Sequence, residues 1–188
     1  EMRKAKGMTP EKAAETLKHT LYYGVMLVKE GKAEGMVAGA VNSTSNVLRP
    51  SLQILKTAPG TKLVSAFFAI VCPDKTLGSD GVFVFGDSGL VENPDADELS
   101  EIAISSAKSF KTLTGKEPSV AMLSYSTYGS AHSVLTEKVV EATKLAKEKA
   151  PDLNLDGELQ LDAAIVPSVG ESKAKGSPVA GHANVLVF

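Results

Sequence analysis

The fold is best read from the stretch GMVAGAVNSTSNVLRP, which runs from Gly35 to Pro50. Residues 36–40 form a short apolar run of small side chains, which is typical of a buried strand. A hydroxyl-rich turn follows at residues 41–46, and the pattern then predicts a helix that continues to about Lys56. The stretch therefore predicts a strand, a polar turn and a helix in direct succession, which is a building unit of α/β folds.

The same alternation continues through the rest of the chain. Residues 10–31 predict a helix that Thr9 caps and in which Pro10 takes the first position. We further predict strands at residues 63–72, 81–85, 119–123 and 183–188, a partly extended segment at 153–161, and helices at 94–114, 136–150 and 162–166. Residues 73–80 predict a hairpin-like connection. Strands separated by helices predict an α/β fold with a mostly parallel sheet and helices on both of its faces.

The composition excludes several classes of protein. Hydrophobic residues make up 43% and the formal net charge is −2, so a core can form and no basic excess for nucleic acid is present. The longest apolar run, Leu63–Cys72, is too short to span a bilayer, and the chain starts without a secretory signal. A single cysteine excludes an internal disulfide. His19, His132 and His182 follow no metal-ligand spacing, so no metal site is predicted. We expect a cytoplasmic protein that binds neither nucleic acid nor membrane.

The turn at residues 41–46 is the first candidate ligand site. Ligands of parallel sheets bind beyond the carboxyl ends of strands, and a helix start offers free backbone N–H groups that attract anions. Ser43 and Thr44 add hydroxyl donors, and Arg49 adds a guanidinium fork that suits phosphate oxygens. The pattern indicates a phosphate site, and an ordinary helix cap with a surface arginine explains the same residues.

The loop at residues 124–133 is the second candidate, because it is rich in hydroxyls and also follows a predicted strand. Its Ser126 and Thr127 either line a substrate cleft or serve the cap of the following helix. Cys72 and Asp87, at the ends of two predicted strands, are more simply read as structural residues. No glycine-rich nucleotide fingerprint is present.

The stretch that begins at Gly35 resembles the signature of the phosphate acetyl/butyryl transferase family. The resemblance rests on Val37–Ala40, Ser43 with Thr44, and Leu48–Thr57. Further matching blocks follow in the family's order and cover nearly the whole chain: Val84–Asp87, Glu101–Ala107, Val120–Thr127, Asp156–Ala164 and Gly176–Gly181. Asn42 departs from the pattern, since many members have His at that position.

The resemblance implies a phosphate acetyltransferase, in which the thiolate of coenzyme A attacks acetyl phosphate directly and phosphate leaves. Coenzyme A is then a substrate, with no covalently bound cofactor and no metal. The family's phosphate-binding arginines map to Arg49 and Arg3. Its Ser-Arg pair and catalytic Asp fall beyond Phe188, so no catalytic residue is assigned and we expect residues 1–188 alone to be inactive. Two alternatives stay open, namely a non-catalytic acetyl-CoA-sensing domain as in multidomain malic enzymes, and a phosphate butyryltransferase.

The resemblance also implies an architecture like that of isocitrate and isopropylmalate dehydrogenases, with a second α/β domain inserted in the first. Residues 1–60 would belong to the first domain, residues 61–183 would form the inserted one, and residues 184–188 would be a strand returning to the first. Family members are usually homodimers that meet through the inserted domain. Dehydrogenase activity is not predicted, because the sequence shows no dinucleotide motif.

Overall fold

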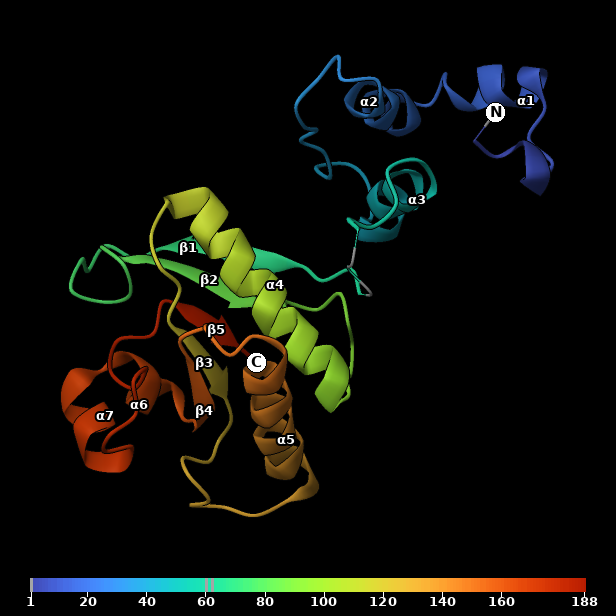
Figure 1. The fold of residues 1–188 in the computed structure, drawn as a ribbon. Helices are drawn as coiled ribbons and strands as arrows, with labels where there is room; N and C mark the ends of the chain where they lie inside the picture. Colours follow the sequence, from blue (N-terminus) through green and yellow to red (C-terminus); the bar gives the residue numbers. More distant parts are fainter. Residues whose placement is uncertain (1, 60, 62) are drawn as a thin grey trace. The chain divides into compact units, whose positions relative to one another are not determined.

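The computed structural model describes residues 2–59, 61 and 63–188 (Figure 1). The chain divides into two compact units, Glu1–Thr61 and Lys62–Phe188. The predicted domain boundary at residue 60 falls on a residue outside the described range. No helix in the described residues is both long and apolar enough to cross a membrane.

The first unit contains helices and loops. A short 3₁₀ helix, η1 (Lys4–Lys6), precedes α1 (Pro10–Thr16), α2 (Thr20–Lys29) and α3 (Thr44–Ile54). Thr9 caps α1 as predicted, because its side chain accepts a hydrogen bond from the backbone N–H of Lys12. The single helix predicted over residues 10–31 is wrong: the backbone changes to the tighter i→i−3 bonding at Lys18 and His19, which ends α1 before α2 begins.

The strand predicted at residues 36–40 is also wrong. This segment has no regular secondary structure, and the side chains of Val37 within it and of Val41 directly after it are fully exposed. A strand needs a neighbour to pair its backbone groups, and the described part of the first unit contains no strand to serve as one. The helix that follows is present as predicted.

The second unit is built on one sheet of five strands, β1 (Phe67–Val71), β2 (Val82–Gly86), β3 (Val120–Leu123), β4 (Leu155–Leu159) and β5 (Val185–Val187). Their order across the sheet is β1-β2-β5-β3-β4. β1 and β2 form the predicted antiparallel hairpin, and every other neighbouring pair is parallel. This confirms the predicted α/β fold with a mostly parallel sheet.

The buried strand predicted at residues 183–188 is present as β5. It lies at the centre of the second unit's sheet, between β2 and β3. Val185, Leu186 and Val187 are all buried, which explains the continuous apolar run: a central parallel strand is covered on both faces.

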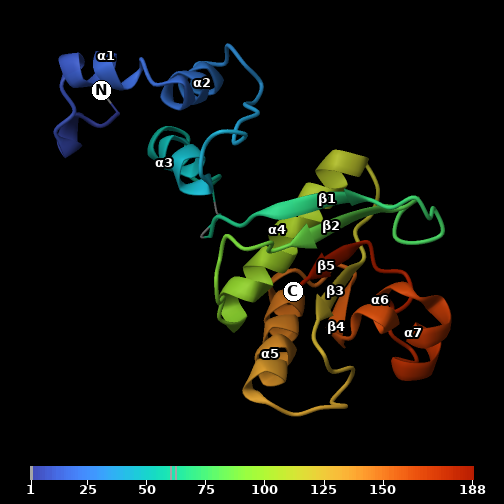
Figure 2. The same ribbon diagram turned by 180° about the vertical axis from the view of Figure 1, so that it is seen from behind.

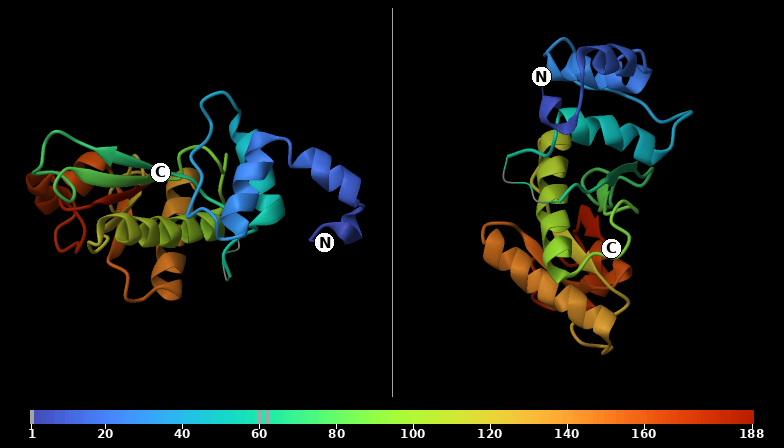
Figure 3. Two further views of the ribbon diagram at one scale, coloured as in Figure 1. Left: turned by 90° about the horizontal axis from the view of Figure 1, so that it is seen from above. Right: turned by 90° about the vertical axis from the view of Figure 1, so that its right-hand side faces the viewer.

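Two helix layers cover the sheet, as the right-hand view of Figure 3 shows for α4 (Ala96–Thr114) and α5 (Val134–Lys149) on one side. The side chains alternate between the layers. Val84, Met122 and Val187 pack toward α4 and α5, whereas their neighbours in sequence Phe83, Ala121 and Leu186 belong to the core on the other face. α6 (Leu161–Ile165) and α7 (Pro167–Lys173) cover that second face (Figure 2). The helix predicted at residues 162–166 is therefore confirmed, and α7 was not predicted.

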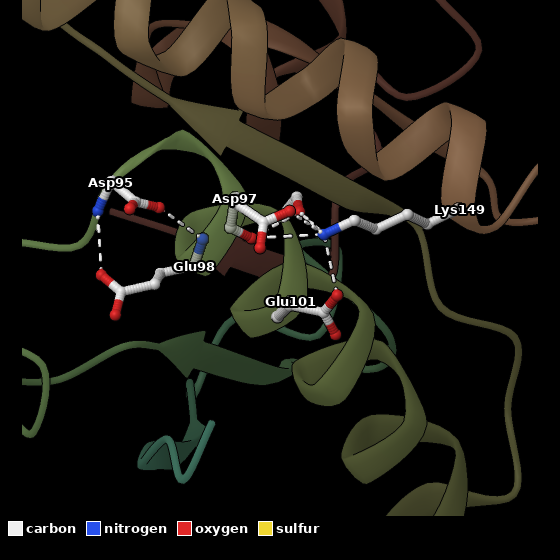
Figure 4. A network of polar contacts seen from close by, with 6 residues as sticks. Asp95, Asp97, Glu98, Glu101 and Lys149 are labelled. Carbon is white, nitrogen blue, oxygen red and sulfur yellow. Dashed lines mark hydrogen bonds and ion pairs between the residues drawn. The ribbon is translucent and has the colours of Figure 1, made fainter. Parts of the chain in front are cut away.

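Lys149, at the end of α5, links this helix to α4 by ion pairs and a hydrogen bond (Figure 4). The Lys149 ammonium lies 2.6 Å from Asp97 Oδ1 and 2.8 Å from Glu101 Oε1, and it donates a hydrogen bond to Ser100 Oγ at 2.7 Å. Burial alone would lower the pKa of Lys149, but the hydrogen bonds to Asp97 and Glu101 outweigh burial and raise this pKa above its ordinary value. The lysine is therefore charged and serves the packing of the two helices.

Replacing Lys149 with Met is expected to lower the free energy of unfolding by about 1–2 kcal/mol at low salt, and by less in high salt, because a partly buried network loses its one cation. The matched control is Lys144→Met on the same helix, because within the described part of the chain Lys144 makes just one ion pair, an exposed contact of 3.9 Å with Glu141. Urea unfolding at two salt concentrations checks the prediction. Equal losses in the two variants would contradict it.

Candidate functional site

The first candidate site begins at the amino end of α3. The Ser43 side chain accepts a hydrogen bond from the backbone N–H of Asn46 at 3.3 Å and lies 3.1 Å from Ser45 Oγ. Thr44 is exposed and opens the helix. Ser43 thus has the capping role that the simpler interpretation assigned to it. Capping leaves the rest of the helix terminus exposed, and free N–H groups with partial positive charge stay available to an anion.

Arg49 lies on α3 one turn beyond that end. Its side chain is exposed, and none of the described residues makes a hydrogen bond or ion pair with its guanidinium. Residues three and four apart share a helix face, so Arg49 stands between Ser45 on one side and Gln53 on the other. Arg49 therefore shares a face of α3 with Ser45 near the exposed helix start and with Gln53 one turn further on.

One turn after Arg49 on α3, Gln53 lines a hollow in the same unit. The hollow has a volume of about 250 Å³, and Gln53 and Arg3 both line it. Tyr22, which also lines it, donates a hydrogen bond from its hydroxyl to Gln53 Oε1 at 3.2 Å. The other lining residues are mostly apolar: Met2, Met8, Ala13, Thr16, Leu17, Met26 and Ile54.

Arg3 lines the hollow, whereas Arg49 is not among its lining residues and lies one helical turn before Gln53 on α3. A guanidinium in a mostly apolar hollow suits a ligand with an anionic group at one end and an apolar part at the other. The charge of the first unit agrees with this chemistry, since residues 1–61 contain nine Lys and Arg but five Asp and Glu. Residues 62–188 contain 11 and 17 of them, respectively.

The second predicted site uses its hydroxyls inside the protein. Ser126 is completely buried, donates to Glu158 Oε1 at 2.8 Å and accepts from the N–H of Ala131 at 3.0 Å. Thr127 is 5% exposed, and its hydroxyl accepts from the N–H of Gln160 at 2.9 Å. These bonds tie the loop to the end of β4, which favours the structural alternative for both residues.

The same loop ends in a helix cap. Ser133 accepts a hydrogen bond from the N–H of Thr136, whose hydroxyl in turn accepts one from the N–H of Ser133. Asp87 is structural too, because its carboxylate accepts hydrogen bonds from the backbone N–H groups of Gly89, Leu90 and Val91. Among the described residues, no group of three or more His, Cys, Asp or Glu side chains is placed to hold a metal ion.

Two buried acids in β4 escaped the sequence analysis. Asp156 is 4% exposed and receives hydrogen bonds from Lys147 at 2.8 Å and from the hydroxyls of Tyr128 and Ser177. Burial alone would raise the pKa of Asp156, but the bonds from Lys147, Ser177 and Tyr128 outweigh it and hold the pKa below its ordinary value. Glu158 is 3% exposed and receives the bond from Ser126. The sequence pattern that could have revealed them is a short strand in which two acids, Asp156 and Glu158, stand between Leu155 and Leu159.

A small hollow of about 240 Å³ lies where the parallel strands end in the second unit. It is lined by Leu123, Ser124, Leu161 and Phe188. Leu123 is the last residue of β3 and Phe188 directly follows β5, so the hollow occupies the carboxyl edge of the sheet, where α/β proteins bind ligands.

Known proteins match this chain over its whole length. A sequence model of a family described as phosphate acetyl/butaryl transferase matches residues 1–188. A protein named phosphate acetyltransferase from Acetivibrio thermocellus is 71% identical over 188 residues, which are all of this chain and 57% of that protein. A protein of the same name from Escherichia coli is 48% identical over 188 residues, which are all of this chain and 25% of that protein.

Solved structures show the same similarity. The EutD phosphotransacetylase from Staphylococcus aureus superposes with a TM-score of 0.86 at 46% sequence identity, covering 100% of this chain and 56% of that one. A phosphotransacetylase from Streptococcus pyogenes gives a TM-score of 0.86 at 44% identity and covers 100% of this chain and 55% of that one. The chain therefore spans little more than half the length of either solved relative.

Proposed function

Since this chain belongs to the phosphate acetyl/butaryl transferase family, we propose that the protein containing it transfers an acetyl group reversibly between acetyl phosphate and coenzyme A. The observation that carries the proposal is the unpaired guanidinium of Arg49, one helical turn from the hollow that Arg3 lines. Acetyl is favoured over butyryl because two relatives that are 71% and 56% identical to this chain are named phosphate acetyltransferase.

The reaction needs two substrates to meet in one orientation. The thiolate sulfur of coenzyme A donates an electron pair to the carbonyl carbon of acetyl phosphate, and a carbon–sulfur bond forms. The bond between that carbon and the phosphate oxygen then breaks, and its electrons leave with phosphate. The thiol proton passes to a base. Such a reaction is accelerated chiefly by orientation and by donors placed against developing negative charge.

Within this chain, we assign Arg49 and Arg3 to anionic phosphate groups of the substrates. A guanidinium fork can hold two phosphate oxygens at once, and Arg49 has no competing partner among the described residues. The amino end of α3, with Ser43 and Thr44, adds N–H and hydroxyl donors to the same region. For Ser126 and Thr127 we propose that they shape the loop after β3, because both hydroxyls are buried and bonded.

We further propose how the complete protein uses its cofactor, how it assembles and where it acts. Coenzyme A acts as a substrate, and no covalently attached cofactor takes part. The complete protein is a homodimer with the two-domain arrangement of the isocitrate dehydrogenase fold, in which residues 61–183 form the inserted domain. It works in the cytoplasm.

The test is an assay of the full-length protein for acetyl-CoA formation from acetyl phosphate and coenzyme A, with butyryl phosphate as the competing substrate. We expect turnover with acetyl phosphate and a lower kcat/KM with butyryl phosphate. The reverse preference would make the protein a butyryltransferase. Binding of acetyl-CoA without turnover of either substrate would replace the proposal by a regulatory acetyl-CoA-binding domain.

A further inference from the structure

A hollow of about 420 Å³ lies in the second unit between α5, β4 and the loop that follows β3. Its lining includes Glu137, Val140 and Glu141 from α5, Glu158 from β4, and Tyr128 and His132 from the loop. The volume is in the range of sites that take small organic ligands. None of the residues that we assign to acetyl transfer lines this hollow, so it is a separate place on the molecule.

Glu158 is buried at this hollow without a cation beside it. The residue is 3% exposed, and its carboxylate accepts two hydrogen bonds, from the Ser126 hydroxyl at 2.8 Å and from the Gly129 N–H at 2.7 Å, both at Oε1. No described residue donates to Oε2 or forms an ion pair with Glu158. Among the described residues, no side-chain oxygen is both fully enclosed and without a hydrogen-bond partner. Oε2 is therefore reachable from the hollow that Glu158 lines.

The other buried acid of β4 is neutralised within the protein. Asp156 pairs with the Lys147 ammonium at 2.8 Å and accepts hydrogen bonds from the hydroxyls of Tyr128 and Ser177. Taking a carboxylate out of water is costly unless a cation or a full set of donors meets it. Glu158 has donors at one oxygen and no cation within the described part of the chain. A positive group in the hollow would supply both the second hydrogen bond and the opposite charge.

Two further carboxylates make the hollow more negative. Glu137 and Glu141 stand one turn apart on α5, where like charges repel each other. No described residue pairs with Glu137, and Glu141 has one ion pair in the described range, an exposed contact of 3.9 Å with Lys144. The first turn of a helix favours an acid such as Glu137, but this explains neither Glu141 nor the buried Glu158.

The class of ligand follows from the charge and the lining of the hollow. No group of three His, Cys, Asp or Glu side chains in the described residues is placed to hold a metal ion, so the three carboxylates do not close around one small ion. A ligand that meets them has to carry positive charge at more than one place. Val140 and the ring of Tyr128 offer apolar surface to methylene groups, and an aromatic ring also attracts ammonium groups.

We propose that this hollow binds a short aliphatic diamine. One ammonium group donates to Glu158 Oε2, and the other lies between Glu137 and Glu141. The inference goes beyond acetyl transfer and does not depend on it. Diamine binding is measured by the heat of binding, whereas acetyl transfer is measured by the formation of acetyl-CoA, so either proposal can fail while the other holds.

The ligand class is tested by isothermal titration calorimetry of the full-length protein with 1,4-diaminobutane at low ionic strength. We expect saturable binding of one molecule per chain. Butylamine has a chain of the same length but one ammonium group, and it should bind at least about tenfold more weakly because one charge-assisted contact is lost. The absence of saturable binding, or equal affinities for the two amines, overturns the proposal.

The place of binding is tested with Glu158→Gln. Glutamine keeps Oε1 as the acceptor for Ser126 and Gly129 and removes the buried charge, so the dissociation constant for 1,4-diaminobutane should rise at least about tenfold. The control Glu148→Gln removes the same charge from an exposed position of α5 outside this hollow. It should change the dissociation constant by less than about twofold. Equal effects of the two substitutions overturn the proposal.

A second variant keeps the test decisive if Glu158→Gln does not fold. Glu137→Gln combined with Glu141→Gln removes two carboxylates at exposed positions of α5, where substitutions have little effect on stability. The dissociation constant of this double variant for 1,4-diaminobutane should also rise at least about tenfold, because the second ammonium group loses its partners. A dissociation constant equal to that of the parent protein rules out the site.

Discussion

Replacing Arg49 with Ala in the full-length protein is expected to lower kcat/KM for acetyl-CoA formation at least about a hundredfold, since one charge-assisted phosphate contact is lost. The side chain is exposed and has no partner among the described residues. No hydrogen bond or ion pair between described residues of the first unit depends on its guanidinium. The loss should therefore appear in substrate turnover and not in the unfolding midpoint.

Two control variants distinguish the effect of the planar guanidinium geometry of Arg49 from the effect of its positive charge. Arg49→Lys keeps the charge but cannot bind two oxygens in one plane, so its kcat/KM should fall between those of the parent and the alanine variant. Lys12→Ala removes one exposed positive charge from the same unit and should change kcat/KM by less than about twofold at moderate salt. An Arg49→Ala enzyme with at least half of the parent's activity would remove Arg49 from the site.

The second large effect is expected on stability. Asp156→Ala should lower the free energy of unfolding by about 3 kcal/mol at pH 7, because it leaves the Tyr128 and Ser177 hydroxyls without their acceptor and breaks a partly buried ion pair with Lys147. The control Asp152→Ala changes an exposed carboxylate four residues away and should cost less than about 0.5 kcal/mol. Urea unfolding followed by circular dichroism measures both.

The hydrogen bonds of Asp156 also predict how the difference in unfolding free energy between the parent and Asp156→Ala depends on pH. The pKa of Asp156 is held below its unfolded value of about 3.9. Its contribution is therefore present above about pH 4 and disappears as the pH falls through the folded value. The gap in stability between the parent and Asp156→Ala should narrow in acid. A gap that widens below pH 4 would show that the carboxylate is not the stabilising form.

Elements of the second unit could be predicted because their signals are local. The helix predicted at residues 94–114 has a capping box at Asp95 and Glu98 and ends at Gly115, whose φ is +69°. Features that depend on residues far away in the sequence could not be predicted. The central place of β5 follows from its pairing with β2 and β3, and the exposure of residues 36–40 follows from the lack of a paired strand in the described part of the first unit.

The candidate site likewise contains residues that could be predicted from the sequence and features that depend on tertiary packing. Ser43 and Arg49 stand out in sequence because a cap and a cation six residues apart mark one helix start. The hollow does not stand out in the sequence, since Arg3, Tyr22 and Gln53 come together only when α1, α2, α3 and the segment before α1 pack together. For Ser126 and Thr127, the sequence offered two uses of a hydroxyl, and only the partners Glu158 and Gln160 distinguish them.

The unequal charges of the two units have a kinetic consequence. With nine cationic against five anionic side chains in residues 1–61, and 11 against 17 in residues 62–188, the chain presents a field of opposite sign from each unit. A polyanion diffusing nearby is drawn toward the first unit and repelled by the second, which biases its encounters before any contact forms. Ions in solution weaken such guidance within a Debye length of about 8 Å. Capture of an anionic substrate will therefore slow with ionic strength even where the chemical step stays constant.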